Sequence, residues 1–183
     1  QDGNPAYFIL GAVAGILPDT IDFKFYRFFY KHDIRVESHP EQLDPQPVAD
    51  AVAKAVSLAM EGKRTTLKLA SIKMGADNWR QYRVKIDPDV GEVRVQFGPI
   101  VSTRQVPQPD TLPDPRPVAT AKFSAPILQS YEPTYTVDIF DGPSFAFKRN
   151  EAGQVEIDFL PWHRNWSHSL TVGLVLAGIA SFW

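Results

Sequence analysis

The sequence predicts an α+β protein in which N- and C-terminal transmembrane helices, both incomplete, flank a small and mainly antiparallel β-rich extramembrane domain with one amphipathic helix. Three observations support this fold class. Apolar runs lie near both ends of the chain, one segment between them has the apolar period of a helix, and several others alternate as strands do. The predicted divisions are residues 5–31, 32–160 and 161–183.

The two apolar runs are Tyr7–Leu17 and Leu170–Trp183, about 11 and 14 residues long, whereas a membrane-spanning helix needs about 20. Runs of this length are also typical of buried core helices. Neither run has the polar stripe of an amphipathic core helix, and both are rich in small residues, which allow close helix packing in a bilayer. We therefore expect two membrane helices that continue beyond the given chain, and a multi-pass membrane location.

The segment after the first run is aromatic and basic, which predicts an interfacial helix that anchors the chain at the membrane surface. Its basic residues Lys24, Arg27 and Lys31, together with Arg164, lie on the inner side of the loop between the two runs. Positive charge beside membrane helices favours the cytoplasmic side. We therefore expect the central domain to be cytoplasmic.

The central domain begins with a predicted amphipathic helix over Pro47–Glu61, because its apolar residues recur at helical spacing and Gly62 provides a stop. From Thr65 the apolar period changes to two, which indicates strands. The apolar positions of the successive strands are Leu67 and Leu69; Tyr82, Val84 and Ile86; and Val93, Val95 and Phe97. The sequence DPDVGE between the last two sets predicts a hairpin turn.

A Pro-rich segment over 105–117 follows, with prolines at 107, 109, 113, 115 and 117. Proline excludes helix and favours extended chain, so this segment is predicted to be a strap that wraps the surface or docks on a partner. Alternation then resumes in TYTVDIF, SFAFK and VEIDF, which predict three more strands.

Composition limits the function. The 19 basic and 21 acidic residues give a net charge of −2, so no bulk field attracts nucleic acid, and we expect no nucleic-acid partner. The chain has no cysteine, which excludes disulfides and thiolate metal sites. Any metal must therefore be bound through nitrogen and oxygen.

Asp19 and Asp22 follow the first apolar run and stand three residues apart, so they share a face if a helix continues there. They also have a structural explanation, because acidic residues are favoured at the N-terminus of an interfacial helix over Thr20–Tyr30. His163 and His168 precede the second run. They too are either functional residues or ordinary residues of a membrane interface. Five residues correspond to about 140° on a straight helix, so both imidazoles can converge only if the chain turns after Pro161.

Together the two pairs predict a divalent metal site at the membrane interface. Two carboxylates and two imidazoles meet if the apolar runs pack side by side, and this donor set favours Zn²⁺, with Mn²⁺ or Fe²⁺ as alternatives. A metal-bound water ionises near neutral pH and can attack an ester, amide or phosphoester. Arg164 would then hold an anionic group of a substrate that is lipid-linked or delivered by the membrane.

The motifs LPDTID and HRNWSHS resemble those of the YdjM-like family of membrane-bound metal-dependent hydrolases. The resemblance covers about 35 residues at the two ends of the chain. It implies that Asp19 and Asp22 belong to the acidic motif, and that His163, Arg164, His168 and Ser169 belong to the histidine motif, with Arg164 and Ser169 in catalysis. The acidic pair is spaced D-x-x-D where the family has D-x-D, and Ser167 stands where the family commonly has threonine.

A second function is open from the sequence. The short apolar runs, the Pro-rich strap and the β-rich region are also typical of a non-catalytic accessory subunit that buries surface only in a larger membrane complex, for example a photosynthetic or respiratory one. Its partners would then be membrane lipid and other membrane subunits.

Overall fold

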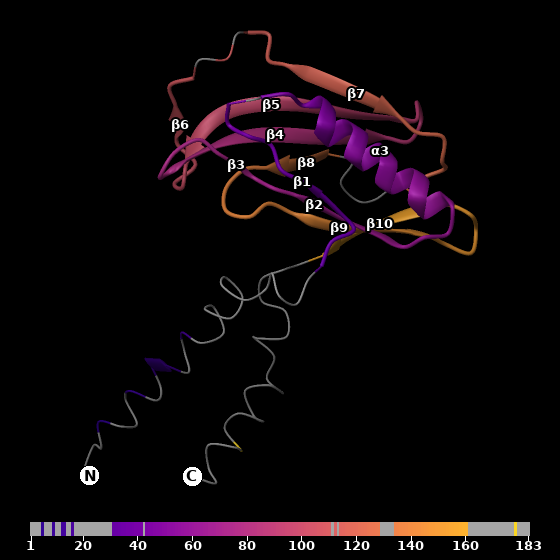
Figure 1. Cartoon of the computed structure of the whole chain (residues 1–183), viewed down its shortest axis with the longest axis horizontal. Helices are drawn as coiled ribbons and strands as arrows, with labels where there is room; N and C mark the ends of the chain where they lie inside the picture. Colours follow the sequence, from indigo (N-terminus) through magenta and orange to yellow (C-terminus); the bar gives the residue numbers. More distant parts are fainter. Residues whose placement is uncertain are drawn as a thin grey trace. The chain divides into compact units, whose positions relative to one another are not determined.

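The structure is a computed structural model that describes residues 31–41, 43–110, 112, 114–128 and 134–160, together with the single positions 5, 9, 12, 13, 16 and 178. Contacts divide the chain into two units, one made of Gln1–Lys31 and Pro161–Trp183 and the other of His32–Leu160. All of the elements below belong to the second unit, which contains two β sheets and one helix (Figure 1).

Sheet A contains four strands in the order β1-β2-β9-β10. β1 (Ile34–Val36) is parallel to β2 (Thr65–Leu69), whereas β9 (Ser144–Arg149) is antiparallel to both β2 and β10 (Val155–Leu160). Parallel neighbours need a crossover connection, and helix α3 (Gln46–Met60) provides it between β1 and β2. The first half of sheet A is therefore a β-α-β unit, and its second half is a hairpin.

Sheet B is antiparallel and is built around the hairpin of β4 (Asn78–Asp87) and β5 (Glu92–Ser102). Two short strands pair with each of these long strands. They are β3 (Ile72–Lys73) and β8 (Thr134–Val137) beside β4, and β6 (Pro107–Gln108) and β7 (Val118–Lys122) beside β5. The hairpin therefore forms the centre of sheet B.

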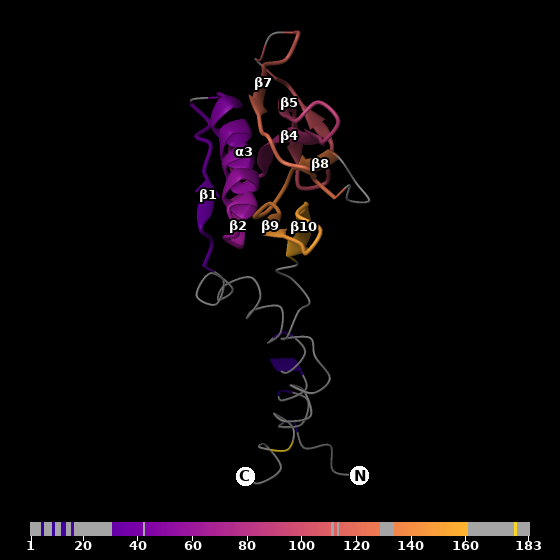
Figure 2. The same ribbon diagram turned by 90° about the vertical axis from the view of Figure 1, so that its right-hand side faces the viewer.

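Helix α3 packs against strands of both sheets (Figures 1 and 2). Val48, Val52 and Val56 recur every four residues on one face and are at most 1% exposed. Burying a side chain of this type stabilises the fold by about 1.5–3 kcal/mol. The Asp44 carboxylate accepts a hydrogen bond from the Gln46 N–H at the start of the helix, and Gly62, with φ +91°, follows its end. The helix therefore joins the two sheets into one core.

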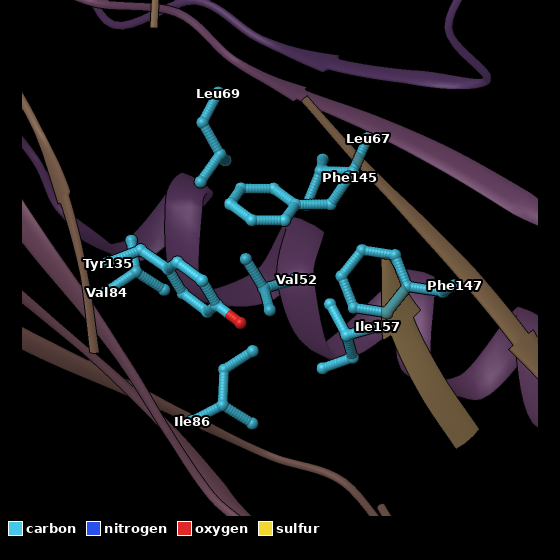
Figure 3. A pocket seen from close by; sticks show the side chains of 9 residues that line it. All are labelled: Val52, Leu67, Leu69, Val84, Ile86, Tyr135, Phe145, Phe147 and Ile157. Atoms are coloured by element: carbon cyan, nitrogen blue, oxygen red, sulfur yellow. The ribbon is translucent and has the colours of Figure 1, made fainter. Parts of the chain in front are cut away.

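The core between the sheets is close-packed. Nine side chains from α3 and both sheets converge on one point (Figure 3), and all except Tyr135 are purely hydrocarbon. The space among them is about 10 Å³, barely the volume that one water molecule requires. Tyr135 and Phe145 pack edge to face there, with ring centroids 4.7 Å apart. The core is therefore a packing feature and offers no room for a ligand.

The predicted helix and hairpin are confirmed. The helix expected over Pro47–Glu61 is α3, Gln46–Met60, and the turn expected at DPDVGE joins β4 to β5. The three later strand predictions correspond to β8, β9 and β10. The short strands β1, β3, β6 and β7, the parallel pairing of β1 and the division into two sheets were not predicted.

The predicted fold class is wrong in its transmembrane helices. Among the residues described, none of the helices combines the length and the hydrophobicity that crossing a lipid bilayer requires. The described fold is mostly β-sheet with a single helix of 15 residues, and the assignment of transmembrane helices is corrected with it. The physical reason lies in length, because the described helix α3 has 15 residues and a membrane-spanning helix needs about 20. Most of both runs lies outside the described residues.

The loop between β8 and β9 is held to sheet A by a buried lysine. Lys68 on β2 is 1% exposed, and its Nζ donates a hydrogen bond of 2.9 Å to the Gly142 carbonyl and lies 2.9 Å from the Asp141 carboxylate. Gly142 has φ +69°, and a Cβ at this position would overlap the carbonyl oxygen of Leu69. Only glycine fits this close approach without a shift of the backbone.

Gly142→Ala is expected to destabilise the unit by about 1–3 kcal/mol more than Gly62→Ala, as measured by urea unfolding. Both positions have positive φ, so both variants carry the strain of a left-handed alanine, about 1–2 kcal/mol. A Cβ at Gly62 meets no atom within 4 Å, whereas one at Gly142 meets backbone. Equal losses in the two variants would contradict the close approach.

Candidate anion-binding site

The outer face of sheet B carries a regular grid of polar side chains. Residues 82, 84 and 86 of β4 and 93, 95 and 97 of β5 are buried, so the alternate residues project from the opposite face. Lys85 lies directly opposite Arg94, and Arg83 directly opposite Gln96. Thr134 on β8 lies beside Lys85. All five side chains are exposed.

These five residues line a surface hollow of about 230 Å³, called here the basic hollow. Its lining consists of Arg83, Lys85, Arg94, Gln96 and Thr134. Two guanidinium groups, one ammonium, one amide and one hydroxyl supply hydrogen-bond donors, and none of these side chains is a carboxylate. Such a donor set can bind an anion.

Among the described residues, two acidic side chains lie next to one end of the basic hollow. Asp87 and Glu92 form the next cross-strand pair, with Lys122 of β7 beside Glu92. Lys85 Nζ lies 2.9 Å from the Asp87 carboxylate, and the hydrogen bond from Lys85 lowers the pKa of Asp87. Within the described part of the chain, Arg83 and Arg94 have no acidic partner within 4 Å. Two of the three cations are therefore available to a ligand.

A buried ion-pair network holds the Pro-rich strap beside the far end of the basic hollow. The guanidinium of Arg80 is fully buried and binds both oxygens of Asp110, with distances of 2.6 and 2.7 Å. Arg116 also binds Asp110, and both arginines donate to the carbonyl of Gly98, two residues from Gln96. The strap therefore wraps the surface of its own unit and leads into β7, which pairs with β5 beside the hollow.

This network keeps Asp110 ionised. Hydrogen bonds from Arg80, joined by those from Arg116 and the Leu112 N–H, hold the pKa of Asp110 well below its usual range. A carboxyl with a lowered folded-state pKa contributes stability that is complete above its unfolded pKa of about 4. The contribution is lost only as the pH falls toward the folded-state pKa, so the strap remains anchored in mild acid.

The structure does not test the metal site that the sequence predicted. Asp19, Asp22, His163 and His168, with Arg164 and Ser169, lie outside the described residues. Within the ranges that are described, no three of the His, Asp and Glu side chains are placed to hold a metal ion together. The Zn²⁺ site and the divalent alternatives therefore stay predictions.

Sequence reasoning missed the basic hollow, although the signal was present. The alternation that identified β4 and β5 also assigns Arg83, Lys85 and Arg94 to the face opposite the core. The turn between Asp87 and Glu92 sets the register and brings Lys85 opposite Arg94. Thr134 could not have been found in this way, because its position depends on pairing between β8 and β4, far apart in the chain.

Comparison of the chain with protein-family models, with curated proteins and with solved structures finds no match.

Asp110→Asn is expected to reduce the free energy of unfolding by about 3–5 kcal/mol, because the variant leaves the buried guanidinium of Arg80 without a counter-charge. Urea unfolding at pH 7 measures the change. Asp87→Asn is the matched control, since it removes the carboxylate of an exposed pair and should leave stability close to that of the unmodified protein. Similar stabilities of the two variants would show that Asp110 does not anchor the strap.

Proposed function

We propose that the unit His32–Leu160 is a non-catalytic binding module of a larger protein assembly, and that it holds an acidic partner through the basic hollow. The observation that carries the proposal is the direct cross-strand pairing of Lys85 with Arg94. Like charges at directly opposed positions destabilise a sheet, so stability alone does not favour this pair. Residues whose placement lowers the stability of the fold are expected at functional sites.

Sheet A provides an internal comparison. Lys148 on β9 lies directly opposite Glu156 on β10, with Nζ and a carboxylate oxygen 3.0 Å apart, and it also contacts Asp158. Opposite charges therefore face each other across this hairpin. The corresponding hairpin of sheet B has a cation in both places. Cross-strand ion pairing explains the first arrangement but not the second, in which Lys85 contacts Asp87 of its own strand and Arg94 has no acidic partner within 4 Å among the described residues.

The chemistry of the hollow favours a protein partner over nucleic acid. None of the five lining side chains is aromatic, whereas sites for single-stranded nucleic acid combine cations with aromatic rings on which bases stack. The net charge of −2 also supplies no long-range attraction for a polyanion. An acidic segment that engages two or three cations locally needs neither feature.

Arg94→Gln is expected to weaken binding of poly-L-glutamate about tenfold, because one charge-assisted hydrogen bond is lost. Fluorescence anisotropy at low salt measures the affinity. The same substitution should not lower the stability to urea, since it removes one member of a like-charge pair. Arg64→Gln is the matched control, because Arg64 is exposed between α3 and β2 and the net charge changes equally.

Two results would contradict the proposed function. Poly-L-glutamate binding that is equally weakened by Arg94→Gln and Arg64→Gln would indicate a general charge effect. A clear loss of stability in Arg94→Gln would show instead that Arg94 supports the fold.

The second candidate function is a metal-dependent hydrolase, and it is supported by the HRNWSHS and LPDTID motifs alone. Asp19, Asp22, His163 and His168 would hold the metal, and Arg164 and Ser169 would act on the substrate. The metal would supply an ionised water for hydrolysis. The two functions are compatible, because the motifs and the basic hollow belong to different units of the chain.

If the second candidate is correct, elemental analysis of the full chain should find about one divalent ion per chain, as a single site of this donor set requires. His163→Ala or His168→Ala should release the ion, because each removes one ligand. His39→Ala, at an exposed position of the described unit, should retain it. A full chain that contains no divalent ion when purified without chelator would remove the metal-site prediction and leave the binding module unaffected.

A further inference from the structure

We infer that the basic hollow binds a phosphoryl group carried by a segment of the partner protein. The inference rests on the proposed function and specifies the ligand at the same site. It depends on the size of the hollow, the charge within it and the surface beside it.

The size of the hollow favours a single charged group. Pockets that enclose drug-sized ligands are about 300–1,000 Å³. The basic hollow, at about 230 Å³, is smaller and opens to the surface of sheet B. It can take the head of a ligand whose remaining atoms lie outside. A ligand of this kind must therefore make additional contacts elsewhere on the sheet.

The charge and donors of the hollow match a phosphoryl group better than a carboxylate. A phosphorylated side chain carries about −1.5 to −2 charges near pH 7 and three strong acceptor oxygens, whereas a carboxylate carries one charge and two oxygens. Three cations line the hollow, together with the amide of Gln96 and the hydroxyl of Thr134. Arginine in particular forms paired hydrogen bonds with phosphate oxygens.

The register of the hairpin places these donors close enough to share one group. Side chains directly opposite each other in an antiparallel pair have Cβ atoms about 4.5–5.5 Å apart, so Lys85 and Arg94 can reach the same anion. Arg83 lies two residues from Lys85 on the same face. The Lys85–Asp87 contact does not prevent this, because both side chains are partly exposed and such pairs contribute little.

The surface next to the hollow favours a polypeptide as the carrier. Val118 of β7 lies directly opposite Gln96 and is 40% exposed, and Thr120 lies directly opposite Arg94. An extended segment that places its phosphoryl group in the hollow can cover Val118 with an apolar side chain. A free inorganic phosphate has no group that would use this contact.

The test compares three probes with the full chain by isothermal titration calorimetry and by NMR of the backbone amides. They are inorganic phosphate, a peptide with one phosphoserine between apolar residues, and the same peptide with glutamate in place of the phosphoserine. At pH 7.5 the phosphoserine peptide should bind about tenfold more tightly than the glutamate peptide, because it offers an additional charge-assisted hydrogen bond. The amide signals of Gln96 and Thr134 should shift with the phosphoserine peptide and with inorganic phosphate.

The pH dependence of binding distinguishes the phosphoserine peptide from the glutamate peptide. The second pKa of the phosphoryl group is about 6, whereas that of a glutamate is about 4.3. The advantage of the phosphoserine peptide should therefore shrink between pH 7.5 and pH 5, while binding of the glutamate peptide changes little. Arg83→Gln should reduce the advantage at pH 7.5, and Arg104→Gln, which alters an exposed arginine in the turn after β5, should not.

Equal affinities of the two peptides at pH 7.5 would overturn the phosphoryl inference. If poly-L-glutamate binding still depends on Arg94 in that case, the proposed binding module stands and only the phosphoryl ligand is rejected. If poly-L-glutamate binding does not depend on Arg94, the binding module is rejected as well. Binding of inorganic phosphate as tight as that of the phosphoserine peptide would overturn the assignment to a partner protein and indicate a free phosphorylated compound.

Discussion

The register of the β4–β5 hairpin is the constraint on which the rest of the described structure depends. Side chains alternate between the two faces of a strand, so the register that buries Tyr82, Val84 and Ile86 against α3 and sheet A also exposes Arg83 and Lys85. A slip of one residue would exchange the two sets and bury the cations. The core and the basic hollow are therefore two consequences of the same pairing. Burial of the core residues specifies this register strongly. The same register fixes the positions of the side chains that line the basic hollow.

Polar anchors hold the irregular segments against this framework. The ion pair between Arg80 and Asp110 holds the strap to β4, and Lys68 holds the β8–β9 loop to β2. Both cations are almost completely buried, so each must be paired to avoid a large desolvation penalty. The anchors position β7 and β8, the two short strands on either side of the hairpin. The outer face of sheet B is consequently wider than the hairpin alone.

The function proposed here differs in kind from what the terminal motifs suggest. The motifs indicate hydrolysis at a metal, and they lie in the unit outside the described residues. The described unit instead presents a hollow lined by three cations and no carboxylate, and its core is close-packed. A rigid sheet suits binding, because its side chains are held in place before the partner arrives and less conformational entropy is lost on association. An assembly can use such a module whether or not another part of the same chain is an enzyme.

Elements whose signal is local can be predicted from the amino-acid sequence. Helical spacing in α3 and alternation in β4, β5, β9 and β10 follow from neighbouring residues, and Gly62 ends the helix through its own backbone freedom. In contrast, the pairing of β1 with β2, the position of β9 between β2 and β10, and the contact between Asp110 and Arg80 become visible in the folded chain alone. The expected membrane helices are not found among the described residues, where no helix is both long and apolar enough to cross a bilayer. Pairings between distant segments depend on which surfaces fit together after the chain has closed long loops, and no local pattern records that fit.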